Sequence, residues 1–450
     1  MVDKVIALTG GADIEAENLK NQILNAKDSI GVGKKTYYLS EKGNDLNDGL
    51  SPERPIKSFL HIADLPLEEG DSVLLERGSV FRAEEMLWIK SGISYGAYGN
   101  GEKPYVLGSV RDFADAEIWK QTDNKAIWST ELRQKRAGII TFNNDTYAGV
   151  WKYHKCQLLK DGDFYHDTEN GVLYLYFEAG NPGEYFENIE ISTTEVAIRG
   201  SDLENVKVDN IYFKYHTVGA FLFGECNGIT ITNCVMGWGG GKIFNVGKSN
   251  IPARYGNAVE FWHLGKDIAV KNCWVYQQFD AALTFQGYGE ETANFKNIKF
   301  DDNLIEYCSM NIEFWARDDE DGTPAHIEDI SYKGNIIRFA GYGWGGIQRF
   351  TKQNQAALLG WNYRYKDLHN FVITENIIDC ADCHLVYMIL PNENKGMTVY
   401  GNTYFQKPTS CRHTYVQPVR GVDIYATDDE QLKEAISTFD EAPKLVKWLG

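Results

Sequence analysis

A short phrase of alternating apolar residues, an asparagine and a further apolar strand recurs between residues 196 and 405. This repetition constrains the fold strongly, because a short repeat buries its apolar face only by stacking on its neighbours. The period-two alternation predicts strands, and no helix-sized segment separates the phrases. The phrases are VKVDNIYF, ITITNCVM, IAVKNCWV, IKFDDNLI, ISYKGNII, FVITENII and MTVYGNTYF, with asparagines at Asn210, Asn233, Asn272, Asn303, Asn335, Asn376 and Asn402. The sequence therefore predicts a β-solenoid.

The recurring asparagines are expected to stack in an interior turn, where their amides can hydrogen-bond from coil to coil. Asparagine also marks ordinary surface turns, but repetition along the whole series favours the ladder. Cys234 and Cys273 each follow one of these asparagines, which predicts matched interior positions and not metal ligation.

With its opening segment TYYLSEKGNDLNDGLSPERPIKSFLHI, this pattern resembles the right-handed parallel β-helix superfamily, which is pectin-lyase-like in fold. The resemblance covers roughly residues 36–410. It implies an all-β, right-handed parallel β-helix solenoid, and most members of the superfamily are carbohydrate-active enzymes.

The ends and one internal segment depart from the repeat. Residues 13–27 have helical apolar spacing, and Thr427 with Glu430 forms a capping-box pattern ahead of a second helix. Both helices are expected to cap the solenoid. We predict an N-terminal cap (1–35), first coils (36–100), an inserted small β subdomain (101–190), the main β-helix with the active-site groove (191–410), and a C-terminal tail with its cap helix (411–450).

A second strand should precede each asparagine phrase, and the alternation aligns AFLFGE, AVEFWH, ALTFQG, NIEFWA, GIQRFT and LVYMIL. Successive side chains of a strand point to opposite faces. Placing Val259, Leu283, Ile312, Ile347 and Val386 inward gives one outward row of Phe221, Glu260, Thr284, Glu313, Gln348 and Tyr387. A second outward row contains Trp262, Gln286 and Trp315. The repeated Glu-Phe-Trp triplet thus places an acid outward, Phe inward and Trp outward.

The outward acids suggest hydrolytic chemistry. Glu260 and Glu313 lie two coils apart, with backbones roughly 9.6 Å apart, and Asp280 lies at the edge of the same face. Glycoside hydrolysis needs two carboxyl groups separated by about 5 Å for retention or about 6.5 to 9.5 Å for inversion. We expect Asp280 and Glu313 as the catalytic pair, with Glu260 assisting.

Other side chains near this face are candidates for substrate binding. Trp262 and Trp315 would be sugar platforms, or would pack beneath loops, and Arg349 would bind substrate or pair with a carboxylate. His263 would assist proton transfer or form an ordinary surface hydrogen bond. The full predicted binding set is Trp262, Trp315, Gln286, Gln348, Arg349, His263, Trp344 and Tyr387.

The formal net charge of -18 disfavours nucleic acid and polyanionic partners. The acidic segment 317–322 (RDDEDG) offers Asp318, Asp319 and Asp321 to a calcium ion, but it lacks the alternating loop signature, so a solvated turn is favoured and no cofactor is expected. No apolar run is long enough to cross a bilayer, so a membrane is not an expected partner. Without a recognisable signal peptide we expect a cytoplasmic protein, or a secreted one if a leader was removed.

These observations favour a glycoside hydrolase acting on a neutral or weakly charged oligo- or polysaccharide. A polysaccharide lyase or epimerase acting on uronate-containing glycans is the alternative, although the outward rows offer few cations or phenols. A non-catalytic carbohydrate-binding solenoid is the second alternative, because fold does not dictate function. The sequence leaves monomer and homo-oligomer undecided.

Overall fold

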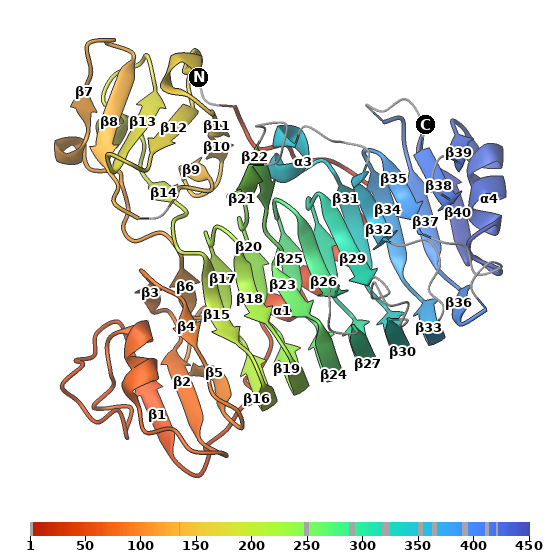
Figure 1. Cartoon of the computed structure of the whole chain (residues 1–450), viewed down its shortest axis with the longest axis horizontal. Helices are drawn as coiled ribbons and strands as arrows, with labels where there is room; N and C mark the ends of the chain where they lie inside the picture. The colour runs from red at the N-terminus through yellow and green to blue at the C-terminus, as the bar shows by residue number, and fades with distance from the viewer. Residues whose placement is uncertain are drawn as a thin grey trace.

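In the computed structural model the chain winds into a solenoid with three ten-stranded sheets (Figure 1). The structure describes residues 3–134, 136–246, 252–287, 293–316, 325–349, 354–361, 367–388, 395–409, 414–419 and 422–450. Within each of the three sheets neighbouring strands are parallel, except for an antiparallel last pair in the second sheet. The predicted all-β, parallel β-helix fold is confirmed.

The first sheet contains β1 (Thr36–Leu39), β2 (Ser72–Glu76), β5 (Ser94–Tyr98), β16 (Leu203–Asp209), β19 (Cys226–Thr232), β24 (Leu264–Lys271), β27 (Asn294–Asp301), β30 (His326–Lys333), β33 (Asp367–Thr374) and β36 (Met397–Tyr400). The second sheet contains β4 (Leu87–Trp88), β15 (Val196–Gly200), β18 (Gly219–Phe223), β23 (Val259–Trp262), β26 (Ala281–Gly287), β29 (Met310–Ala316), β32 (Ala356–Trp361), β35 (His384–Tyr387), β38 (Thr414–Val419) and β39 (Val422–Ala426). The third sheet contains β3 (Val80–Arg82), β6 (Tyr105–Leu107), β17 (Tyr212–Lys214), β20 (Val235–Gly237), β25 (Trp274–Tyr276), β28 (Leu304–Glu306), β31 (Ile336–Ala340), β34 (Ile377–Ala381), β37 (Thr403–Gln406) and β40 (Leu445–Trp448).

The asparagine ladder is interior in the later coils and shifts by one residue in the earlier ones, where Asn272 still donates a side-chain hydrogen bond to Asn233. Asn303, Asn335 and Asn376 each donate a side-chain hydrogen bond to the next asparagine, at 2.9 to 3.0 Å, and Asn402 continues the series to Asp440. In the earlier coils Asn210, Asn233 and Asn272 adopt positive φ, a conformation that asparagine tolerates, and the residue that follows each enters the interior. The predicted single register is therefore wrong for these three coils.

Cys234 and Cys273 occupy the interior position that asparagine fills further along the solenoid. Both are fully buried, and the Cys273 backbone N–H donates to Asn303 Oδ1 at 3.0 Å. A small apolar thiol fits this stack because its neighbours are core side chains. The prediction of matched interior positions for these two cysteines is confirmed.

The two predicted cap helices have different positions. α4 (Asp429–Ser437) packs Leu432, Ala435 and Ile436 into the main core at the C-terminal end. Its N-cap is Asp428, which accepts from Gln431 N at 2.9 Å, one residue later than the predicted capping box. α1 (Asp13–Leu24) instead packs Ala16 and Ile23 against the outer face of the third sheet, so it does not cover an end. At the N-terminal end, the 3-10 helix η1 (Phe59–Asp64) contributes Phe59 and Ile62 to the core.

Within residues 101–190, β6 pairs in the third sheet, and separate small sheets follow it. Their strands are β7 (Lys120–Gln121), β8 (Ile127–Glu131), β9 (Ile140–Phe142), β10 (Tyr147–Ala148), β11 (Val150–Trp151), β12 (Asp163–Asp167), β13 (Val172–Tyr176) and β14 (Ile189–Ile191). The shorter helical elements here are η2 (Ala116–Ile118), η3 (Lys155–Gln157) and α2 (Pro182–Tyr185). These strands have their own core, which includes Phe142, Phe164 and Leu175. Figure 1 shows this small β subdomain projecting from the solenoid.

Two further elements lie near the second sheet. A hairpin of β21 (Lys242–Val246) and β22 (Pro252–Tyr255) leads into β23, and the short helix α3 (Trp344–Gln348) precedes β32. Half-buried Arg254 joins the hairpin to the small β subdomain, because it donates to Gly138 O at 2.9 Å and its guanidinium carbon lies 4.9 Å from the Trp151 ring centroid. Every helix in the described ranges is too short or too polar to span a membrane.

Candidate active site

The outward face of the second sheet carries the repeated acid and tryptophan positions. Glu260 on β23 is opposite Thr284 on β26, which is opposite Glu313 on β29. The next outward row places Trp262, Gln286 and Trp315 opposite one another, and Phe261, Phe285 and Phe314 lie between the two rows in the core. The alternation predicted for the triplet is therefore confirmed.

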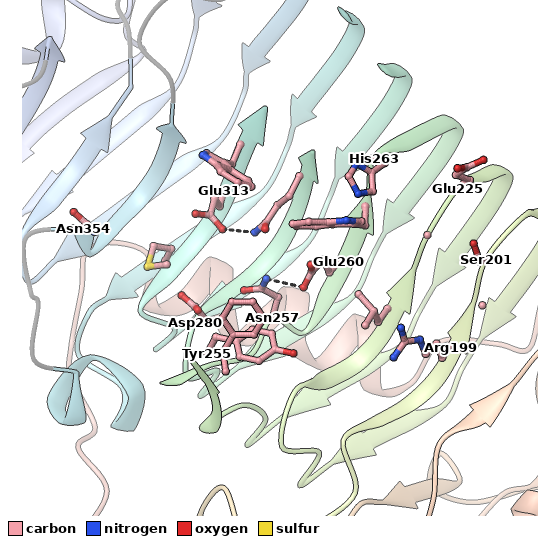
Figure 2. Close-up of a pocket in the computed structure, with 18 of the residues that line it drawn as sticks. Arg199, Ser201, Glu225, Tyr255, Asn257, Glu260, His263, Asp280, Glu313 and Asn354 are labelled. Atoms are coloured by element: carbon pink, nitrogen blue, oxygen red, sulfur yellow. Dashed lines mark hydrogen bonds between the residues drawn. The ribbon is translucent and has the colours of Figure 1, made fainter. Parts of the chain in front are cut away.

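A groove with a volume of about 660 Å³ lies over this face (Figure 2). It brings together most of the predicted site residues, which are Glu260, Trp262, His263, Asp280, Gln286, Glu313, Trp315 and Arg349. Figure 2 shows Glu260, Asp280 and Glu313 around the same part of the groove. Acids from three different coils therefore share one site, as a two-carboxylate mechanism requires.

Glu260 lies in an unusual environment for a carboxyl group. Burial raises its pKa to about 7, while the hydrogen bond from Asn257 opposes this shift and the charge of Asp280 adds to it. Asn257 Nδ2 donates to Glu260 Oε2 at 2.9 Å, and Asn257 Oδ1 accepts from the Ala281 backbone at 2.9 Å. The second bond fixes the amide orientation, so the NH₂ group faces Glu260. This carboxyl group can hold a proton near neutral pH, as a general acid must.

Glu313 is held by the neighbouring strand. Gln286 Nε2 donates to Glu313 Oε2 at 2.9 Å and also lies 3.1 Å from Thr284 Oγ1. Thr284 Oγ1 lies 3.4 Å from the same Glu313 oxygen. These contacts fix the orientation of the Glu313 carboxyl group on the groove floor.

Asp280 and Arg349 form an ion pair within the same groove. Arg349 directly follows α3, and its guanidinium carbon lies 5.7 Å from the Phe279 ring centroid. Of the two roles expected for Arg349, pairing with a floor carboxylate is the one present in this structure.

Two tryptophans lie along the groove beside the acids. The ring centroids of Trp262 and Trp315 are 6.2 Å apart, although their strands are separated by β26. The rings therefore lean toward each other above the strand of Gln286. His263 lines the groove beside Trp262, and their ring centroids are 5.0 Å apart. Aromatic faces in this position suit the apolar C–H surface of a pyranose ring.

Three predicted binding residues do not line this groove. Trp344 is buried against Phe279, and its indole N–H donates to Gln277 O at 2.8 Å. Gln348 Nε2 donates to Gly149 O at 2.9 Å, so it ties α3 to the small β subdomain. Tyr387 is buried and stacks on His384 with centroids 4.9 Å apart. Their prediction as groove residues is corrected, because each side chain is engaged in packing elsewhere.

The error arose from the choice of strand and register. Within the segment GIQRFT, Gly346, Ile347 and Gln348 belong to α3 and Arg349 follows the helix, whereas β32 supplies Leu359 opposite Glu313. Leu222, and not Phe221, lies opposite Glu260. Both alternatives satisfy the same short apolar alternation, so the sequence pattern alone could not choose between them.

Sequence reasoning also missed groove residues from earlier coils and from the hairpin. Arg199, on β15, lies opposite Leu222 of β18. Tyr255 is the last residue of the hairpin, and Asn257 follows two residues later. Extending the strand alignment by one coil to VAIRG would have identified Arg199. No sequence signal would have placed Asn257 against Glu260, because that contact depends on the path of the hairpin.

The predicted calcium ligands Asp318, Asp319 and Asp321 lie outside the described residues. Within the described ranges, no cluster of His, Cys, Asp and Glu has the arrangement of a metal site.

Comparison with known proteins gives partial matches. No family model matches the chain. It is 34% identical over 129 residues to lacto-N-biosidase of Bifidobacterium longum subsp. longum, a match that covers 24% of this chain and 8% of that protein. The chain therefore corresponds to only a small part of this curated relative.

Several solved structures are similar in outline. XylC in complex with xylose has a TM-score of 0.48 and 12% identity, covering 85% of this chain and 72% of that one. A protein described as a glycoside hydrolase has a TM-score of 0.44 and 10% identity, with coverages of 92% and 96%. The GH136 lacto-N-biosidase from Eubacterium ramulus, as its selenomethionine derivative, has a TM-score of 0.37 and 14% identity, with coverages of 92% and 67%.

Proposed function

We propose that this protein is a glycoside hydrolase that cleaves a neutral or weakly charged oligosaccharide in the groove of the second sheet. The observation that carries the proposal is that Glu260, whose pKa is raised, shares one groove floor with a second carboxyl group, that of Glu313. Burial raises the pKa of Glu260 to about 7, whereas Glu313 accepts hydrogen bonds from Gln286 and Thr284. One group is suited to donate a proton and the other to act as a carboxylate.

In the proposed reaction the Glu260 carboxyl group protonates the glycosidic oxygen as the bond from that oxygen to the anomeric carbon breaks. Glu313 removes a proton from a water molecule, whose oxygen forms the new bond to the anomeric carbon. The products are a free hemiacetal and the leaving alcohol. The reaction as proposed uses no cofactor.

The sequence pattern predicts Asp280 in the catalytic pair and Glu260 in an assisting role. In this proposal the two residues have the opposite roles. The guanidinium of Arg349 offsets the charge of Asp280, which makes the carboxylate less suited to act as nucleophile or base. The charge of Asp280 also helps to raise the pKa of Glu260. Asp280 therefore favours the protonated state of the proposed acid.

The nature of the groove supports a neutral substrate. The chain has a formal net charge of -18, and four acids line the groove (Glu225, Glu260, Asp280 and Glu313) against two arginines, Arg199 and Arg349. An acidic sugar would meet repulsion there, whereas Trp262 and Trp315 can pack against a neutral ring. The partial match to lacto-N-biosidase supports glycosidase activity.

The lyase or epimerase alternative has less support on this floor than hydrolysis. It requires a cation for the uronate carboxylate and a base beside it. Arg349 is paired with Asp280, and Tyr387 packs outside the groove. Arg199 is a further cation on the floor, so ultraviolet absorbance of an unsaturated uronate product remains the direct test of a lyase.

The test of the proposed function is a release assay on neutral and acidic oligosaccharides that measures reducing ends and ultraviolet absorbance together. Reducing ends without absorbance are expected. Absorbance would indicate a lyase, and binding without release on every substrate would favour the non-catalytic solenoid.

The stereochemistry of the product tests the assignment of the pair. Glu260 and Glu313 lie two strand spacings apart, roughly 9.6 Å between backbones, which leaves room for a water molecule and predicts inversion. Proton NMR of the freshly released anomer measures this. Retention would contradict the Glu260–Glu313 pair and return Asp280 to the catalytic pair.

A further inference from the structure

The groove extends well beyond the carboxylates toward earlier coils. The outward row that contains Glu260 and Glu313 continues through Leu222 on β18 and Arg199 on β15 to Trp88 on β4. Arg199 is two strand spacings and Trp88 three spacings from Glu260, roughly 10 and 14 Å between backbones. A single pyranose ring at the carboxylates does not reach that far.

Trp88 and Arg199 form one surface at this end. Trp88 is 54% exposed, and the Arg199 guanidinium carbon lies 5.0 Å from its ring centroid. An isolated exposed tryptophan would be unremarkable. Here the ring shares an outward row with the carboxylates and lines the same groove. The guanidinium beside it supplies N–H donors in a fixed plane, which suit sugar hydroxyl groups.

The neighbouring floor positions leave space for a ligand. Near the carboxylates the second outward row carries Trp262 and Trp315, whereas at this end the groove is lined by Gly200, Ser201 and Gly224. Figure 2 shows Arg199 and Ser201 together at one end of the groove, with Asp280 and Glu313 toward the other.

The open space does not stop at Trp88. A second cavity of about 420 Å³ is also lined by Trp88, together with Glu84, Glu85 and Glu195. Trp88 therefore lines both cavities.

We propose that Trp88 and Arg199 form a remote sugar-binding subsite, which holds a neutral pyranose unit of the substrate away from the bond that is cleaved. The inference rests on the proposed function. It makes the preferred substrate an oligosaccharide that lies along the solenoid axis and crosses successive strands. Trp88 packs against the apolar face of the ring, and Arg199 donates hydrogen bonds to its hydroxyl groups.

The test is equilibrium binding of xylo-, cello- and galacto-oligosaccharides of increasing length to the Glu313→Gln variant, measured by calorimetry. Adding Trp88→Ala is expected to raise the Kd of the longer oligosaccharides about tenfold, which is about 1.4 kcal/mol. The Kd of the disaccharides should rise much less. Trp88→Phe should recover most of the affinity because it keeps an aromatic face. Tyr400→Ala is the matched control, since Tyr400 is 46% exposed on β36 of the first sheet.

The outcomes separate this inference from the proposed function. Equal weakening for short and long ligands, or no weakening, would overturn the subsite. Length-dependent binding in a wild-type protein that releases no product would overturn the hydrolase and support the subsite. If the wild type releases product but Trp88→Ala leaves binding unchanged, the subsite is overturned and the hydrolase is supported. Absence of binding throughout the panel would overturn both.

Discussion

The outer faces of the first and second sheets both display acids, yet they place those acids in opposite electrostatic environments. On the first sheet Glu328 lies 2.7 Å from Lys296, and Asp367 lies 2.6 Å from both His326 and His369. These hydrogen bonds lower the pKa of Glu328 and of Asp367, and both groups remain accessible to solvent. On the second sheet burial raises the pKa of Glu260 to about 7.

The strand geometry is the same on both faces, so the difference comes from what lies above them. Asn257, just after the hairpin, contacts Glu260, and Arg349, just after α3, contacts Asp280. Desolvation disfavours the charged form of a carboxyl group, whereas a nearby cation favours it. A parallel β-helix can thus present similar acids as a solvated surface or as a reactive site, according to the segments inserted between its strands.

The largest expected effect is that of Glu313→Gln. If Glu313 is the catalytic carboxylate, kcat should fall by about a thousandfold, because glutamine cannot remove a proton from water. Initial rates of reducing-end release measure the loss, and thermal unfolding checks that the variant is folded. Glu328→Gln is the matched control on the first sheet. A Glu313→Gln variant that keeps wild-type kcat would contradict its assignment.

Glu260→Gln should reveal the raised pKa through both activity and stability. The wild-type kcat/KM should fall as pH rises through about 7, because Glu260 loses the proton that it donates. Since the folded pKa lies above the ordinary value of 4.5, Glu260 also stabilises the fold at low pH, and this contribution is lost as pH rises through about 7.

The stability difference can be measured by urea unfolding at about pH 5 and about pH 8. Wild type should lose up to about 3 kcal/mol relative to Glu260→Gln between these two conditions. Glu328 provides the opposite sign, since its pKa is lowered and its contribution is lost as pH falls. Parallel pH dependence of wild type and Glu260→Gln would contradict the buried, protonated state.

Glu328→Gln is expected to have the smallest effect. The pair that Glu328 forms with Lys296 is solvent-exposed, so the substitution should leave kcat/KM within about twofold and Tm essentially unchanged. A loss of activity comparable to that of Glu313→Gln would mean that the first sheet, and not the groove, carries the function.

The repeat unit and the outward triplets could be predicted because they depend on local geometry. Period-two alternation determines that Phe261 and Phe314 face the core while Glu260 and Glu313 face outward. It could not identify the strand that follows Glu313, because AALLGW and GIQRFT both contain apolar residues at plausible spacing. The predicted position of the ladder was wrong for a similar reason. Asn233 lies at the turn with positive φ, and the next residue, Cys234, occupies the interior position.

The sequence by itself determined that this chain stacks strands into a solenoid and displays Glu260, Glu313, Trp262 and Trp315 on one face, since a strand's alternation needs no distant partner. Only the tertiary structure decided that Glu260 is buried beside Asn257, that Arg349 pairs with Asp280, and that Arg199 and Trp88 extend the groove. The reason is physical. Burial and pKa depend on every neighbour that a folded chain brings together, including segments far apart in sequence.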